Sequence, residues 1–129
     1  MGRLISYLDT VVVLRLHAGD IEKLSARAKA QIEKSDLLIS AMVVLEMEML
    51  YERGKLKYTS ERIFTDLSQE IGLMVCQIPM AAIVRAATAI KWTREPGDRL
   101  ITANAIANRQ ASLVTSDRSI LENYKNSVW

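Results

Sequence analysis

The sequence contains few of the residues that mark specialised architectures or chemistries. One cysteine, Cys76, excludes an intramolecular disulfide and fits a reducing, cytoplasmic environment. One histidine, His17, is too few for a histidine-based triad, and we expect it at the surface or at the edge of the core. No apolar run approaches the roughly 20 residues that span a bilayer, so no membrane partner is expected. Glycine-rich phosphate loops of the Walker or dinucleotide-binding type are also absent.

The remaining composition is that of an ordinary globular protein. The 129 residues are 50% hydrophobic and 25% charged, and this length predicts a single domain over residues 1–129. Aromatic residues make up only 5%, so aliphatic side chains and methionine must fill the core. The formal net charge of +2 is too small to indicate nucleic-acid binding from composition, and it does not exclude a local basic patch.

Short apolar runs alternate with helical patterns along the whole chain. This alternation predicts an α/β sandwich around a mostly parallel central sheet of four to five strands. The expected strands are 4–8, 37–39, 73–78 and 113–114, with a further edge strand at 127–129. The expected helices are 11–18, 20–34, 41–53, 59–72, 81–92, one opened by Asp98, and 120–124.

Four acidic residues stand out from this pattern. Asp9, Asp98 and Asp117 each precede a predicted helix, where any one of them alone is more often an N-cap than a ligand. Glu46 falls within an apolar sector of its helix, where a carboxylate needs a compensating partner. Burial beside an arginine such as Arg85 or Arg99 is the alternative to a functional role for Glu46.

Taken together, the four acids predict a cation site. Asp9 and Asp117 follow predicted parallel strands, so both belong at the carboxyl edge of the sheet, where open α/β sheets bind ligands. Carboxylates without histidine or thiolate suit Mg²⁺ or Mn²⁺ better than zinc. Arg94, Arg99 and Arg118 flank this acidic edge, and Arg99 and Arg118 are candidate phosphate contacts.

These residues resemble the motifs of PIN-domain proteins. The resemblance covers essentially the whole chain and rests on Tyr7–Thr10, Ile39–Ala41 with Glu46, Glu95–Ile101 and Leu113–Asp117, in the family's order. Within that family, the length and the stretch Arg53–Leu56 look like VapC-type toxins of bacterial toxin–antitoxin pairs.

The resemblance implies a PIN-like fold and a Mg²⁺- or Mn²⁺-dependent ribonuclease. By analogy, Asp9 and Asp98 are direct metal ligands, and Glu46 and Asp117 complete the catalytic and metal-binding site. It also implies a homodimer and a cognate antitoxin that inhibits the enzyme. The hydroxyls that support the carboxylates would be those of Ser40 and Thr115.

The chain departs from the family's pattern in two places. Glu95 and Gly97 stand where an aspartate and an aromatic residue are usual before the third acid, and the missing side chain of Gly97 removes an anchor for the loop that aims Asp98. Val11 replaces the usual polar or aromatic residue after Thr10. Neither change touches an acid, so we expect activity to be retained.

Two other functions compete with the nuclease. One is a PIN-like module that has lost catalysis and only binds partners; four retained carboxylates argue against it, because buried unpaired carboxylates are costly. The other is a phosphoacceptor signalling domain, which requires an acceptor aspartate at a mid-chain strand end. Ser40 occupies that strand end here, and the mid-chain acid Glu46 lies on a helix.

Overall fold

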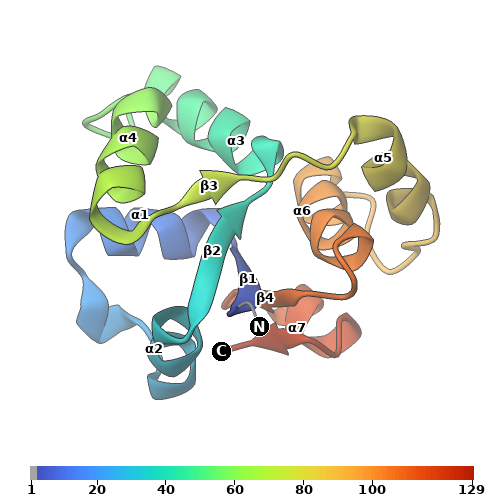
Figure 1. Cartoon of the computed structure of the whole chain (residues 1–129). Helices are drawn as coiled ribbons and strands as arrows, with labels where there is room; N and C mark the ends of the chain where they lie inside the picture. The colour runs from blue at the N-terminus through green and yellow to red at the C-terminus, as the bar shows by residue number, and fades with distance from the viewer. Residues whose placement is uncertain (1–2) are drawn as a thin grey trace.

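A five-stranded parallel sheet forms the centre of the computed structural model, which describes residues 3–129 (Figure 1). Its strand order is β3-β2-β1-β4-β5, and every neighbouring pair is parallel. The expected α/β architecture with a parallel sheet is therefore confirmed. The strands are β1 (Leu4–Leu8), β2 (Ser35–Ile39), β3 (Met74–Val75), β4 (Ser112–Val114) and β5 (Ser127–Val128).

The strand order places a topological switch beside β1. From β1 the chain moves outward through β2 to the edge strand β3, and it then returns to add β4 on the other side of β1. The backbone N–H of Asp9 donates to Val114 O at 3.0 Å, which joins the carboxyl ends of β1 and β4. In open α/β sheets the crevice at such a switch is the usual ligand site.

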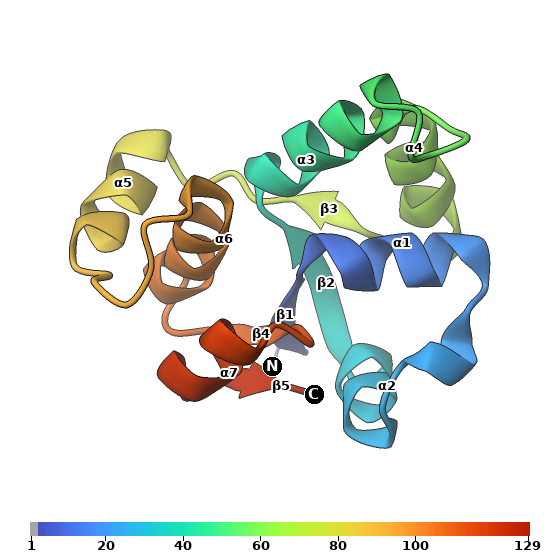
Figure 2. The same cartoon turned by 180° about the vertical axis from the view of Figure 1, so that it is seen from behind.

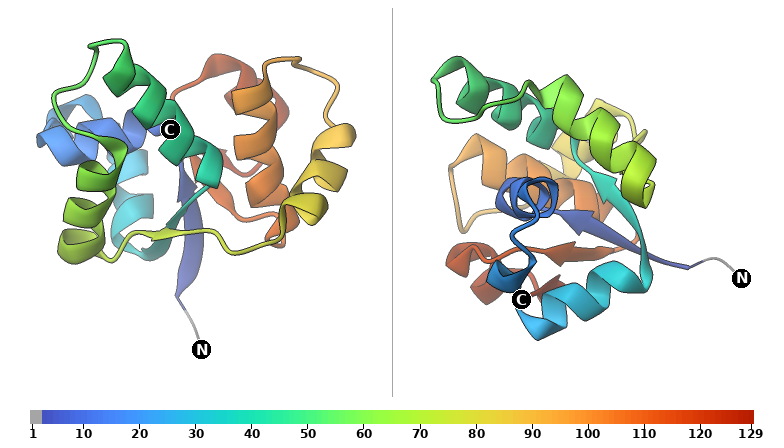
Figure 3. Two further views of the ribbon diagram at one scale, coloured as in Figure 1. Left: turned by 90° about the horizontal axis from the view of Figure 1, so that it is seen from above. Right: turned by 90° about the vertical axis from the view of Figure 1, so that its left-hand side faces the viewer.

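Four of the helices form two pairs beside the sheet (Figures 1 and 2). Helices α3 and α4 lie together on one side, whereas α5 and α6 form a pair on the other; a view from above shows the same separation (Figure 3). In residues 3–129, no helix has both the length and the apolar character needed to cross a membrane. The bounds are α1 (Thr10–Ala18), η1 (Ile21–Lys23), α2 (Ala26–Glu33), α3 (Ala41–Glu52), α4 (Ser60–Ile71), α5 (Met80–Thr88), α6 (Pro96–Ala107) and α7 (Arg118–Asn123).

Two hydrophobic clusters fill the interior. The larger one is built on β1, β2 and β4 and on the inner faces of α1, α3 and α4, with fully buried Leu8, Ile39 and Leu113 among its members. The smaller one joins α5 to α6 through Ile83, Ala87, Ile90 and Ala103. As the low aromatic content predicts, aliphatic side chains make up most of both clusters.

Several predicted boundaries were wrong. The polar helix expected over 20–34 is interrupted at Leu24, which is extended and buried, and α2 restarts after Ser25, whose side chain accepts the Ala28 N–H. The strand expected over 73–78 is only β3, because the β2 strand with which it pairs ends at Ile39. The helix expected over 81–92 ends at Thr88.

Candidate active site

Asp9 lies at the switch point with both carboxylate oxygens engaged. Its Oδ1 accepts the Thr10 N–H at 2.8 Å, so Asp9 caps α1 as its position before a helix predicts. Its Oδ2 accepts the hydroxyl of Thr115, at the end of β4, at 2.6 Å. The second bond joins residues 106 positions apart in the chain and fixes the carboxylate between the two central strands.

Glu46 is half-buried on α3 and finds its partner on α1. The residue Thr10 is only 7% exposed, and its hydroxyl donates to Glu46 Oε1 at 2.5 Å. A hydroxyl thus compensates the carboxylate in place of the alternative arginine partners. Arg99 instead donates to Ala87 O in α5 at 2.9 Å, and Arg85 is exposed. Thr10, the residue directly after Asp9, therefore connects Glu46 on α3 to the start of α1.

Asp98 lies in the first turn of α6 and does not cap it. The N-cap is Glu95, whose Oε1 accepts the Gly97 N–H at 3.0 Å. Burial and the negative charges of Asp117, Asp9, Glu95 and Glu46 raise the pKa of Asp98 to about 6. Since these charges are felt at Asp98, the acids predicted from distant parts of the sequence share one region of the molecule.

Asp117 caps α7, as its position before a helix predicts. Its Oδ1 accepts the Ile120 N–H at 3.0 Å, and its own N–H donates to Thr115 Oγ1 at 3.0 Å. Thr115 therefore contacts both Asp117 and Asp9 and holds the two strand-end acids in a fixed relation.

Burial is the main cause that raises the pKa of two further carboxyls. For Asp9 it outweighs the lowering effect of the bonds from Thr115 and Thr10, and the charge of Asp117 adds to it. For Glu46 it outweighs the hydroxyl of Thr10, and the charges of Asp9 and Glu95 add to it. Both carboxylates are thus desolvated and repelled by neighbours, and a nearby cation would relieve both costs.

The separations between these carboxylates are not those of a closed ion cage. Across residues 3–129, no three histidine, cysteine, aspartate or glutamate side chains are set so as to hold a metal ion. The donor chemistry nevertheless fits a hard cation. The groups whose charges act on Asp98 are all carboxylates, those of Asp117, Asp9, Glu95 and Glu46. Hydrogen bonds from Thr10 and Thr115 orient the carboxylates of Glu46 and Asp9, and each carboxylate oxygen keeps a further lone pair for a cation.

The predicted supporting residues lie in different surroundings. The Thr115 hydroxyl donates to Asp9 Oδ2. Ser40 caps α3 by accepting the Met42 N–H and also accepts the Asn104 side-chain N–H, so its hydroxyl links α3 to α6. Of the candidate phosphate contacts, Arg118 is exposed at the start of α7, whereas Arg99 is engaged with α5.

Three further residues contribute to this region beyond the predicted site. Thr10 bonds Glu46, and a hydroxyl directly after Asp9 is the sequence signal for that bond. Glu95 caps α6, and the proline after it marks such a helix start. Gly97 was interpreted as a missing anchor, whereas it is buried against the Glu46 side chain.

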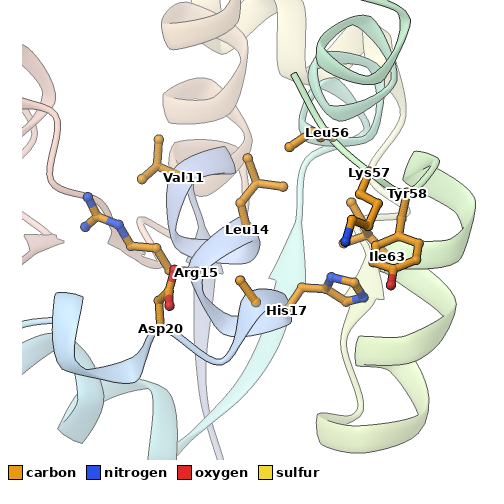
Figure 4. A pocket seen from close by; sticks show the side chains of 10 residues that line it. Val11, Leu14, Arg15, His17, Asp20, Leu56, Lys57, Tyr58 and Ile63 are labelled. Atoms are coloured by element: carbon orange, nitrogen blue, oxygen red, sulfur yellow. The ribbon is translucent and has the colours of Figure 1, made fainter. Parts of the chain in front are cut away.

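A hollow of about 590 Å³ beside α1 is lined by none of the four acids. It lies between Arg15 and Asp20 on one side and Lys57 and Tyr58 on the other (Figure 4). His17 lines it, and His17 Nε2 lies 2.8 Å from Asp66 Oδ2 on α4, which confirms a boundary position for the histidine. We take the carboxylates as the candidate site because the charged groups and the switch point coincide there.

Comparison with protein families assigns the chain to a known class. The model of the PIN domain matches residues 6–126, which is nearly the whole chain, and the protein therefore belongs to the PIN-domain family. The resemblance drawn from the motifs is thus confirmed. PIN domains are generally nucleases and typically use divalent metals. Among curated proteins, none matches the chain.

Solved structures agree with this assignment at the level of the fold. VapBC2 from Rickettsia felis, bound to a DNA fragment from their promoter, is similar with a TM-score of 0.60 and 17% identity over 96% of each chain. PAE2754 from Pyrobaculum aerophilum is similar with a TM-score of 0.57 and 18% identity, over 96% of this chain and 87% of that one. Both likenesses show that the fold extends over nearly the whole chain.

Proposed function

We propose that the protein is a Mg²⁺- or Mn²⁺-dependent ribonuclease and the toxin of a type II toxin–antitoxin pair. Hydrolysis adds water to an RNA phosphodiester and breaks one P–O bond. The observation that carries this proposal is the Asp9 carboxylate, held at the switch point by Thr115 and Thr10, with Glu46 tied to the same Thr10. These contacts hold Asp9 and Glu46 in defined orientations, and this supports a role for both carboxylates in binding the ion.

Each acid has a distinct part in the proposed site. Asp9 and Asp98 would be direct metal ligands, and Glu46 and Asp117 would complete the site directly or through water. A divalent ion bound there supplies activated water and stabilises charge on a phosphoryl oxygen. Thr115 keeps Asp9 oriented, and Thr10 keeps Glu46 from turning away. Arg118, exposed beside Asp117, is available to RNA phosphates.

The proposed partners follow from the class of protein. VapBC2, which shares the fold, was found bound to a DNA fragment from their promoter, and this supports a cognate antitoxin for the present chain. We propose that this antitoxin inhibits the enzyme, that two copies of the chain form a homodimer and that the protein acts in the cytoplasm. The lone cysteine agrees with a reducing compartment.

A non-catalytic PIN-like module is the competing function. The observation in its favour is that, within the described residues 3–129, no three acids are already at ion-holding separations. Under the nuclease proposal, water molecules would complete the coordination of an ion that fewer than three acids hold directly. Under the alternative, the acids serve as helix caps and hydrogen-bond partners alone.

Cleavage of a labelled mixed-sequence RNA distinguishes the two functions. The protein should cut it with Mn²⁺ or Mg²⁺ and stop when EDTA is added. Asp98→Asn should lose at least a hundredfold in rate while keeping the far-UV circular dichroism of the parent. Asp36→Asn makes the same change on the exposed part of β2 and should retain full activity. Equal cleavage by Asp98→Asn and the parent would overturn the nuclease proposal.

A further inference from the structure

Gly97 is the one described glycine that is buried and lacks a left-handed backbone. Gly19, Gly54 and Gly72 have positive φ values, which explains a glycine at each of them. Gly97 is instead the second residue of α6, where the backbone makes no such demand. Glycine in a helix costs about 0.5–1 kcal/mol relative to alanine. Something other than backbone conformation must therefore account for this glycine.

The space around Gly97 is filled by carboxylates. A Cβ atom added there would fall well under 3.0 Å from Glu46 Oε2, closer than real Cβ contacts come. It would also stand 3.2 Å from Glu46 Cδ and 3.2 Å from Glu95 Oε1. The Glu46 carboxylate thus lies directly over the first turn of α6, in the volume that any other residue at this position would occupy.

The Glu46 side chain is not free to give way without loss. Its other oxygen, Oε1, accepts the 2.5 Å hydrogen bond from Thr10, so a rotation away from position 97 breaks that bond. The carboxylate is also half-buried beside Asp9 and Glu95, whose charges it feels. Glu46 is therefore confined between the Thr10 hydroxyl on α1 and the bare backbone of Gly97 on α6.

We propose that Gly97 is a positioning residue that holds Glu46 in the candidate active site by leaving room for its carboxylate. A side chain at position 97 displaces the carboxylate from α6 and from Thr10 together. Glycine replaces the aromatic residue that is usual at position 97, and in this chain the Glu46 carboxylate occupies the space that a side chain there would fill. The link to metal binding rests on the proposed function, whereas the confinement of Glu46 does not.

A double-mutant cycle without metal tests the confinement. Gly97→Ala in the parent should lower the unfolding temperature by about 4 °C or more, although alanine is the better helix former. In a Glu46→Ala background the same change should raise it, because the clash with Glu46 is gone and only the milder 3.2 Å approach to Glu95 Oε1 opposes the helix preference of alanine. Glu48→Ala is the matched control, since Glu48 lies on α3 but bonds Ser60, and it should leave the loss caused by Gly97→Ala unchanged.

Two further measurements separate positioning from mere packing. Glu46→Asp shortens the side chain by one methylene and should restore the unfolding temperature of Gly97→Ala. A Mn²⁺ titration followed by thermal unfolding should show that Gly97→Ala weakens the apparent affinity about tenfold or more, as loss of one well-placed ligand does.

The outcomes are distinguishable. An equal rise in unfolding temperature on Gly97→Ala in the parent and in Glu46→Ala overturns the proposal, as does an unchanged Mn²⁺ affinity of Gly97→Ala. If Gly97→Ala does not fold, folding of Gly97→Ala/Glu46→Ala supports the proposal, and its failure where Glu46→Ala folds refutes it. A parent without any Mn²⁺ response contradicts the proposed function, while the metal-free cycle still decides the confinement of Glu46.

Discussion

Asp98 is the carboxylate that the fold favours least in its charged form. Partial burial and, after it, four neighbouring carboxylates raise its pKa to about 6, and none of the causes of this shift is a hydrogen bond that would offset them. Asp9 and Glu46, by contrast, receive hydrogen bonds that partly compensate their burial. Asp98 is therefore the acid most available to a cation and the one whose charge costs the free protein most.

The pH dependence of stability should reveal this cost. A folded pKa of about 6, raised from 3.8, means that Asp98 adds stability in full below pH 3.8 and loses it as the pH rises through 6. Asp98→Asn should therefore stabilise the metal-free protein at pH 7.5 by about 1 kcal/mol, a value reduced because solvent screens the half-exposed carboxylate. Urea unfolding in EDTA at pH 5 and pH 7.5 measures the change.

Asp36→Asn controls for loss of charge in this experiment. It lies in an exposed pair with Arg3 and should keep the parent's dependence on pH. If Asp98→Asn shows the same loss of stability between pH 5 and pH 7.5 as the parent, repulsion at Asp98 is not its cause.

At the scale of elements, α1 and α4 are tied by a polar contact beside the hollow of Figure 4. His17 on α1 lies 2.8 Å from an Asp66 oxygen on α4, and Arg62 donates to the same carboxylate at 3.1 Å. Tyr58 stands edge-on to the His17 ring. This group links the helix that carries Thr10 to the outer helix α4, away from the acids.

Asp66 should make the protein sensitive to acid. The hydrogen bond from His17, with help from Arg62, lowers the pKa of Asp66 below 3.8. A lowered pKa contributes stability above pH 3.8 and loses it as the pH falls through the folded value. Asp66→Asn should therefore lower the unfolding temperature slightly at pH 6. It should also show a smaller decrease in unfolding temperature between pH 4 and pH 2.5 than the parent does.

Thermal unfolding followed by circular dichroism measures this effect. Glu70→Gln changes an exposed position of the same helix and should have the unfolding temperature of the parent at pH 6, pH 4 and pH 2.5. A parent-like response of Asp66→Asn would mean that the contact between α1 and α4 does not depend on the charge of Asp66.

Element boundaries were predictable where a local signal fixes them. Residues 4–8 form the expected strand, and the caps Asp9, Ser40 and Asp117 begin helices as their positions predict. The break at Leu24 was not predictable from periodicity, because Leu24 keeps the helical spacing of apolar residues yet leaves the helix to reach the core. The short β3 depends on its partner strand and not on its own sequence.

At the scale of the whole molecule, a divalent ion should stabilise the fold. A ligand that binds only the folded state adds about 2.7 kcal/mol at one hundred times its dissociation constant, or roughly 10 °C for a chain of this size. Mn²⁺ should therefore raise the unfolding temperature at pH 7.5 and raise it less at pH 5, where protons compete for Asp98.

The same titration on Asp98→Asn is the control for where the ion binds. Its response at pH 7.5 should be reduced, whereas Asp36→Asn should respond as the parent does. Equal responses in all three proteins would locate Mn²⁺ outside the candidate site.

The sequence by itself determined the alternation of strands and helices, the caps Asp9 and Asp117 and the identity of the acids, because each depends on neighbours within a few residues. Only the tertiary structure decided how these acids are held. The bonds of Thr115 to Asp9 and of Thr10 to Glu46 span 106 and 36 positions, and they exist because β4 pairs beside β1 and because α3 crosses near α1. The fit of Glu46 over Gly97 likewise depends on where α6 packs against α3, which no local pattern encodes.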